Sequence, residues 1–311
     1  LLVKEKVTIL NQTPSEFYQL ISAEEQLFRS ADNDENALVL REVIFGGEVL
    51  DYRKLKPWVM RHGDSQPKLS NMYGITETTV HVTCRPVTQE DVDFALRTMS
   101  TLNFIGQPIN GLKLHILDAQ NRPVAVGVPG EICVSGEGVA RGYHNRAGLT
   151  ASRFVQLPGI PGKLYRSGDL ARYLPSGEVQ YLGRMDHQVQ LRGYRIELGE
   201  VESAIAAFPG VKENITIVKD DRHGEPQIVC YIVKPTNIEF VDIRQFIKLR
   251  IPEYMIPSSF VSIDVVPLTA NGKIDYAALP APNQVENQVT TLNEVGDAKR
   301  LIELILSQQI T

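Results

Sequence analysis

The chain has 311 residues, of which 43% are hydrophobic and 22% are charged, and its formal net charge is −5 with a pI near 5.8. A chain of this length exceeds the usual size of one hydrophobic core, so we expect two domains. The acidic balance, without a long basic run, excludes the electrostatic footprint of a nucleic-acid-binding protein.

Neither the cysteines nor the first residues indicate an exported protein. Cys84, Cys133 and Cys230 are far apart and odd in number, which fits neither a disulfide framework nor a paired metal knuckle. We interpret them as reduced core thiols. Three charged residues interrupt the apolar stretch 1–10, which is therefore neither a signal peptide nor a membrane span. We expect a cytoplasmic protein with no membrane partner.

The first sixty residues alternate between strand and helix patterns. Residues 7–10 read as a buried strand, and Ser15 is a candidate N-cap for a helix. A polar loop is expected at 30–36, followed by a strand within 40–50 that a glycine pair ends, and by a helix over 52–61. This alternation predicts an α/β layer with a parallel sheet, whose ligands gather at the carboxyl ends of strands.

Candidate functional residues lie at the end of the next predicted strand, within 68–84. Gly74 permits a tight turn and Tyr73 offers an aromatic face. Thr76 and Glu77 place a hydroxyl beside a carboxylate, the hard oxygen ligands that suit Mg²⁺ accompanying phosphates. A polar loop that only caps the following element is the alternative that the spacing leaves open.

Short strands separated by glycines recur over 104–155 and predict a small antiparallel sheet or barrel. The same pattern of short strands separated by glycines continues over 165–200. That stretch carries an expected acidic turn at Gly168-Asp169 and a hairpin at 175–177, which deliver polar side chains at strand ends.

The pattern changes after Asp186 to that of a compact α+β unit of about a hundred residues. An Asn-Gly pair then forces a turn that lifts Lys273 clear of the backbone. Prolines followed by a polar tract read as a linker. The unit is predicted to contain helices at 197–208 and 241–251 and strands at 215–220, 227–234 and 259–267.

Five segments together resemble one family, the adenylation domains of non-ribosomal peptide synthetases, within the adenylate-forming superfamily of acyl- and aryl-CoA synthetases and luciferase. The resemblance extends to about residue 283 and keeps the family's motif order. The segments are NMYGITETT (71–79), GEICVSGEGVARGYHNRAGLTASRF (130–154), YRSGDLARYLPSGEVQYLGRMDHQVQLRGYRIELGEVE (165–202), IPEYMIP (251–257) and NGKIDYAAL (271–279).

The chain departs from the family at its front. The Ser/Thr/Gly-rich phosphate loop followed by Pro-Lys-Gly is not found in the sequence, so the resemblance implies a domain that lacks its N-terminal half. It then assigns 1–185 to the C-terminal portion of a large α/β core subdomain, 186–283 to a small mobile subdomain with its hinge at Asp186, and 284–311 to a linker and the start of a following module.

The resemblance implies a two-step reaction. A carboxylate attacks the α-phosphate of Mg·ATP to give an acyl adenylate and pyrophosphate, and the acyl group then passes to the phosphopantetheine thiol of a carrier protein. Such chemistry requires aligned groups and neutralised phosphate charge. The implied partners are a peptidyl carrier domain, condensation or other synthetase modules, and an MbtH-like protein.

The same resemblance assigns roles to individual residues. Tyr73 would stack on adenine, Thr76 would touch phosphate oxygens, and Glu77 would hold Mg²⁺. Asp169, an acceptor-only carboxylate, would bind both ribose hydroxyls. Lys273 would bridge the substrate carboxylate and the α-phosphate. The nucleotide-binding set as a whole is Tyr73, Gly74, Asp169, Tyr181 and Arg184. A surface ion pair is the alternative for Asp169 and Arg184.

A substrate pocket is also implied, and its residues resemble those of threonine-activating domains. His81 and Asn11 would hydrogen-bond a side-chain hydroxyl, and a site built in this way rejects analogues that lack the group. The alternative is that His81 is a satisfied core histidine. The full set is Asn11, Ile44, Gly46, Met72, Val80 and His81, with Lys273 closing the pocket.

The hinge at Asp186 would let Lys273 serve adenylation and the segment 192–197 serve thioester formation. Two other functions stay open on the sequence alone. One is a stand-alone acyl-CoA or aryl-acid ligase of the same superfamily. The other is an inactive truncated fragment that acts as a binding or docking piece.

Overall fold

A computed structural model describes residues 1–30, 38–99, 103–186, 188–222, 224–234, 238–269 and 273–282. The chain divides into two compact units, 1–186 and 187–311, which are described separately. None of the helices in the described ranges is long and apolar enough to cross a membrane. The Asn-Gly turn at 271–272, the linker 284–311 and all but the first residue of the predicted loop 30–36 lie outside the described residues.

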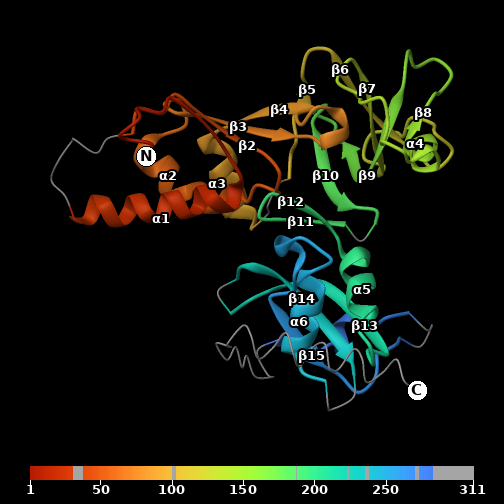
Figure 1. The fold of residues 1–311 in the computed structure, drawn as a ribbon. Coiled ribbons are helices and arrows are strands. Elements are labelled where there is room, and N and C mark those ends of the chain that lie inside the picture. Colours follow the sequence, from red (N-terminus) through yellow and green to blue (C-terminus); the bar gives the residue numbers. More distant parts are fainter. Residues whose placement is uncertain are drawn as a thin grey trace. The chain divides into compact units, whose positions relative to one another are not determined.

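The first unit is built on a five-stranded sheet in the order β1-β2-β3-β4-β5 (Figure 1). The first three strands run parallel, and β4 and β5 join antiparallel. Side chains of the three helices α1, α2 and α3 form one core with the sheet, which includes Phe17, Phe45 and Trp58. The elements are β1 (Ile9–Gln12), α1 (Pro14–Ser30), β2 (Glu42–Phe45), α2 (Lys56–His62), β3 (Lys68–Tyr73), β4 (Thr83–Val87), α3 (Gln89–Thr98) and β5 (Gln107–Pro108).

Two expectations for the start of the chain are wrong. The first strand is not buried, because β1 pairs only with β2 among the described strands, and Ile9 is 54% exposed. Helix α1 begins at Pro14, so Ser15 lies inside the helix. The hydroxyl of Thr13 accepts from the backbone N–H of Glu16 at 3.4 Å instead. Proline at the first helical position has the required φ and no N–H to satisfy, so the helix starts before Ser15.

A second sheet in this unit follows the order β10-β9-β7-β6, with β8 paired to β9, and all its pairings are antiparallel. This confirms the predicted small antiparallel sheet. The elements are β6 (Leu112–Leu117), β7 (Gly130–Gly136), α4 (Ala147–Arg153), β8 (Phe154–Val155), β9 (Leu164–Tyr173) and β10 (Val179–Arg184).

The predicted acidic turn at Gly168-Asp169 is wrong, because β9 runs through both residues. Gly168 has a φ of +76°, and the pairing of β9 with β7 changes register between Arg166 and Leu170. Extra residues in one strand are the mark of a β-bulge, which re-aims a side chain without ending the strand. The bulge leaves Asp169 only 3% exposed.

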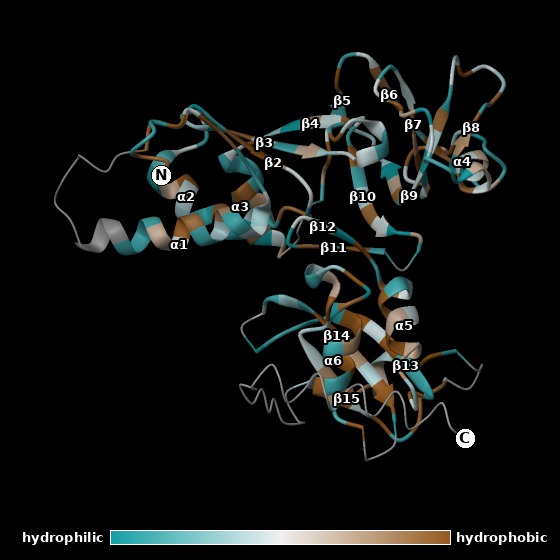
Figure 2. Cartoon of the chain, viewed as in Figure 1, coloured by the Kyte–Doolittle hydropathy of each residue, from teal (hydrophilic) through white to brown (hydrophobic). Residues whose placement is uncertain are grey.

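The second unit is the predicted α+β unit. Its three-stranded sheet has the order β13-β14-β15, and a separate hairpin joins β11 to β12. The hydrophobic run of β14 is largely brown in Figure 2, and it packs with α5 and α6, where Phe208 and Phe246 meet edge to face at 5.1 Å. The elements are β11 (Gln188–Leu191), β12 (Tyr194–Glu197), α5 (Leu198–Ala206), β13 (Glu213–Asp220), β14 (Pro226–Val233), α6 (Phe240–Lys248) and β15 (Ser259–Ser262).

The cysteines are free, as the sequence predicts, although they are not equally buried. Cys133 and Cys230 are buried, and burial raises the pKa of each thiol to about 12. Cys84 on β4 is half-buried, so it is not a core thiol in the same sense. Thiols with raised pKa values are poor nucleophiles, which assigns the two buried cysteines to packing.

Candidate active site

A buried carboxylate, Asp169, lies where strands β3, β9 and β10 bring their side chains together. The Tyr73 hydroxyl donates to Asp169 Oδ2 at 2.6 Å. Arg184 Nη1 lies 3.0 Å from Oδ1, and the Tyr181 hydroxyl donates to the same oxygen at 3.4 Å. The structure therefore places three of the five residues predicted to bind the nucleotide around the carboxylate of a fourth, Asp169.

The two tyrosines are held as hydrogen-bond donors. Burial raises the pKa of Tyr73 well above its usual value, and the charge of Asp169 raises it further. The same two causes raise the pKa of Tyr181. Their rings lie 6.0 Å apart at 41°, which provides aromatic surface beside the carboxylate. Stacking of adenine on Tyr73 stays a prediction.

Arg184 connects Asp169 with Asp186. Its Nε and Nη2 contact the two oxygens of Asp186 at 2.8 and 2.6 Å, while Nη1 also donates to the Ser167 carbonyl at 3.0 Å. Burial lowers the pKa of Arg184, but the hydrogen bond to Asp186 and the charge of Asp169 outweigh it and raise the pKa overall. The side chains of Arg184 and Asp169 are 11% and 4% exposed, so their ion pair is not the surface pair that was the alternative.

The segment 74–80 is a tight loop that only glycine can begin. A Cβ on Gly74 would lie 1.8 Å from the carbonyl oxygen of Val80, and the backbone N–H of Val80 donates to the Ile75 carbonyl at 3.2 Å. A short 3₁₀ turn, η3 (Thr76–Thr78), then carries the predicted phosphate and metal residues. Thr76 is exposed and Glu77 is half-buried.

Glu77 is held by a residue that the sequence did not single out. The Tyr143 hydroxyl donates to Glu77 Oε1 at 2.5 Å and lies 3.2 Å from the Tyr165 hydroxyl. Burial raises the pKa of Tyr143, and the hydrogen bond to Glu77 adds to the effect. Tyr143 lies inside a quoted family segment, but its spacing gives no signal of contact with Glu77.

Glu77 fits only one mode of Mg²⁺ binding, in which the protein supplies few ligands. The described part of the chain contains no group of three or more His, Cys, Asp or Glu side chains that could hold a metal ion. Mg²⁺ that accompanies phosphates is commonly held by one or two carboxylates, with the phosphates and water completing the shell. Glu77 can serve in that mode, whereas a metal caged by protein ligands is not supported there.

Most of the predicted pocket residues lie on or beside one face of the first sheet, and Val80 is the exception. Val43 and Phe45 pack into the core with the helices, so Ile44 and Gly46 face the other side. Asn11 is the strand partner of Ile44. The remaining members approach Gly46 closely: a Cβ there would lie 3.3 Å from His81 Cε1 and 3.7 Å from the Met72 carbonyl oxygen. Val80 is 60% exposed, and no contact places it with the others.

His81 is not the satisfied core histidine of the alternative interpretation. Its Nδ1 is buried without a hydrogen-bond partner among the described residues. Burial also lowers the pKa of His81, so the ring is neutral at pH 7 and offers one donor and one acceptor. A buried polar atom without a partner costs free energy, which a ligand hydroxyl would recover.

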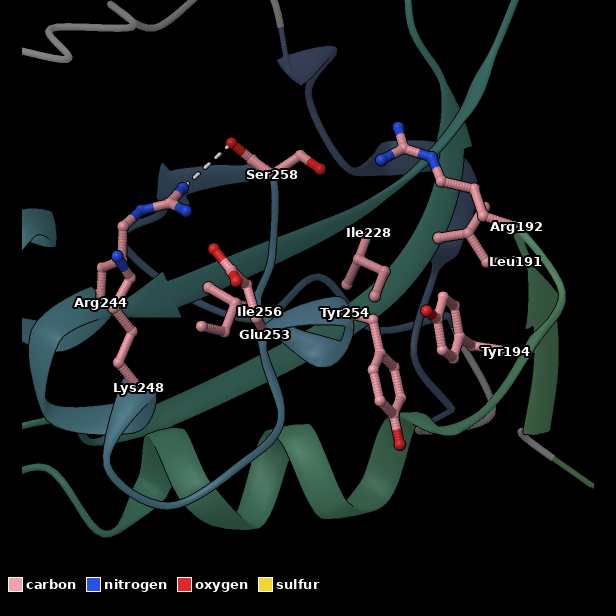
Figure 3. A pocket seen from close by; sticks show the side chains of 10 residues that line it. All are labelled: Leu191, Arg192, Tyr194, Ile228, Arg244, Lys248, Glu253, Tyr254, Ile256 and Ser258. Atoms are coloured by element: carbon pink, nitrogen blue, oxygen red, sulfur yellow. Dashed lines mark hydrogen bonds between the residues drawn. The ribbon is translucent and has the colours of Figure 1, made fainter. Parts of the chain in front are cut away.

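In the second unit, Lys273 is exposed, and its carbonyl accepts from the backbone N–H of Thr269 at 2.7 Å. A pocket of about 310 Å³ lies elsewhere in this unit (Figure 3). Arg192 and Tyr194 of the segment 192–197 line it, and Tyr194 stacks on Tyr254 at 4.1 Å. Its charged lining residues are the cations Arg192, Arg244 and Lys248 and the single carboxylate Glu253.

Two family models match the chain. The model described as AMP-binding enzyme matches residues 1–144, and the model described as AMP-binding enzyme C-terminal domain matches residues 200–273. Together they span most of the chain and both of its units. Both units therefore contain a stretch that matches a model of the AMP-binding enzymes.

Within that family, the similar proteins support a non-ribosomal peptide synthetase adenylation domain. A dimodular nonribosomal peptide synthase of Bacillus subtilis (strain 168) is 45% identical over 91% of this chain and 12% of its own length. A plipastatin synthase of the same organism is 42% identical over 99% of this chain and 11% of its own length.

A solved structure agrees with both the fold and the family. It is a synthetase protein containing adenylation and PCP domains, bound to a vinylsulfonamide inhibitor, and it matches with a TM-score of 0.73 and 30% identity over 88% of this chain and 44% of that chain. The chain therefore spans less than half the length of these proteins.

Proposed function

We propose that the chain is part of an enzyme that activates an amino acid with ATP and transfers it to the phosphopantetheine thiol of a carrier protein. The observation that supports this most directly is the cluster around Asp169, where two tyrosines and Arg184 surround a buried carboxylate. Similarity to peptide synthetases supports the amino-acid substrate and the carrier. We place the reaction in the cytoplasm.

The first step forms a bond between a substrate carboxylate oxygen and the α-phosphorus of ATP, and pyrophosphate leaves. Asp169 holds the ribose by accepting its hydroxyls, and Tyr73 orients the adenine. Thr76 binds phosphate oxygens and Glu77 holds Mg²⁺. The metal ion, when bound, neutralises phosphate charge. Lys273 supplies a point charge toward the substrate carboxylate and the α-phosphate.

In the second step the carrier thiol attacks the acyl carbon, AMP leaves, and the thiol proton is released. We propose that rotation at Asp186 replaces Lys273 by the segment 192–197 between the steps. Condensation or other synthetase modules are partners for the loaded carrier, and an MbtH-like protein is a further proposed partner.

We propose L-threonine as the substrate because His81 combines a neutral ring with a buried, partnerless Nδ1 beside Gly46, within the part of the chain that the structure describes. Asn11 lies on the same sheet face through its pairing with Ile44. Both residues suit a hydroxyl-bearing side chain. This assignment fails if pyrophosphate exchange by the native protein prefers valine to threonine.

Replacing His81 with leucine is expected to lower the preference for threonine over valine by about tenfold, since one hydrogen bond of about 1 kcal/mol is lost and an apolar contact is gained. The measurement is the ratio of kcat/KM in pyrophosphate exchange for the two amino acids. His115→Leu is the control, because its Nε2 pairs with Ser135 within the second sheet. An unchanged ratio in His81→Leu would remove His81 from the pocket.

Two alternatives predict different results. A stand-alone acyl-CoA or aryl-acid ligase would transfer the acyl group to free coenzyme A in preference to a holo-carrier. A fragment that acts only in binding or docking would give no amino-acid-dependent exchange, whether or not it binds ATP.

A further inference from the structure

The side chain of Tyr143 is fixed by packing and by hydrogen bonds to its backbone. Its ring meets Phe154 edge to face at 5.4 Å, and Phe154 packs on Tyr165 at 4.9 Å. The backbone N–H of Tyr143 donates to Thr150 Oγ1 at 2.9 Å. A Cβ on Gly142 would lie 2.4 Å from Thr150 Cγ2, so helix α4 approaches the loop closely. The hydroxyl of Tyr143 is therefore presented from a defined position.

The loop that carries Glu77 is tied to the same region. The backbone N–H of Ala140 donates to the Glu77 carbonyl at 2.9 Å. The hydroxyl of Thr79 donates to the Gly138 carbonyl at 2.7 Å. These two hydrogen bonds locate the main chain around Glu77, while the 2.5 Å bond from Tyr143 holds one oxygen of its carboxylate.

We infer that Tyr143 is a positioning residue that orients Glu77 for the Mg²⁺ ion of Mg·ATP. The inference rests on the proposed function, and specifically on Glu77 as a metal ligand. Where the protein contributes few ligands, the direction of each one decides affinity. Hydrogen-bond partners of metal ligands commonly contribute about 10- to 100-fold to metal affinity or activity.

Tyr143→Phe removes the hydroxyl and keeps the ring that packs on Phe154. The native protein and the variant are each titrated with Mn²⁺ in the presence of ATP and followed by electron paramagnetic resonance. The dissociation constant for Mn²⁺ should be about 10- to 100-fold higher in the variant. The Mg²⁺ concentration for half-maximal pyrophosphate exchange should rise in parallel, and saturating Mg²⁺ should restore most of the rate. Tyr173→Phe is the matched control, because that hydroxyl donates to the Leu114 carbonyl at 3.2 Å in the second sheet.

Glu77→Gln separates the inference from the function on which it rests. If Glu77→Gln weakens Mn²⁺ binding and Tyr143→Phe leaves it within about twofold of the native value, the positioning role is overturned alone, since that is well below the expected effect. If Glu77→Gln itself leaves Mn²⁺ affinity unchanged, the metal role proposed for Glu77 fails, and the inference fails with it. A shift in Tyr173→Phe equal to that in Tyr143→Phe would also contradict a specific role.

Discussion

Asp169→Asn is expected to lower ATP affinity by at least about 100-fold, because two charge-assisted hydrogen bonds to the ribose, each of about 1.5–3 kcal/mol, are lost or weakened. The same change should destabilise the fold by about 3 kcal/mol, the lower end for breaking a buried ion pair. The lower end applies because Arg184 keeps its contacts with Asp186. Calorimetric titration with ATP and denaturant unfolding measure the two effects.

A second, half-buried ion pair separates binding from stability. Asp91 contacts Arg85 at 2.8 Å in a pair whose side chains are 15% and 13% exposed, and it also caps helix α3. Asp91→Asn should therefore cost stability as Asp169→Asn does, yet leave the ATP affinity of the folded protein unchanged. If both variants lose affinity equally, Asp169 acts through the fold rather than on the ribose.

Asp186→Pro is expected to lower the rate of transfer to the carrier by at least about 100-fold, because misplaced reacting groups slow a reaction by about that factor. Amino-acid-dependent pyrophosphate exchange should change little. Proline restricts the backbone torsions on which domain rotation depends. Loading of a holo-carrier with radiolabelled amino acid measures the second step.

The structure requires a further control for this variant, because the Asp186 carboxylate contacts Arg184 through both oxygens. Asp186→Ala removes that ion pair and leaves the backbone free to rotate. The hinge predicts that Asp186→Ala retains carrier loading. Equal losses in the alanine and proline variants would assign the effect to the ion pair and contradict a hinge.

Much of the fold is predictable from sequence, because glycines between short strands fix local geometry, whereas the residues around Asp169 are predicted by the resemblance to the adenylation family. The sequence predicts a turn at Gly168 where the structure has a bulge, since a glycine with positive φ beside a polar residue is typical of both. Only the strand pairing of β9 with β7 distinguishes them. The N-cap was misplaced because Thr13 and Ser15 are both good caps, and Pro14 decides between them.

Contacts between distant residues could not be predicted from one sequence. Tyr143 and Glu77 are 66 positions apart, and Tyr73 and Asp169 are 96 apart. Local propensity carries no information about such pairs. The approach of His81 to Gly46 is of the same kind, because the two residues are distant in sequence.

The central proposal is amino-acid activation, and the most direct test is a pyrophosphate-exchange panel over the proteinogenic amino acids with the native protein and Mg·ATP. The account predicts exchange that depends on an added amino acid and is fastest with L-threonine. Fastest exchange with another amino acid would contradict the pocket assignment alone. Exchange with none of them would contradict amino-acid activation itself.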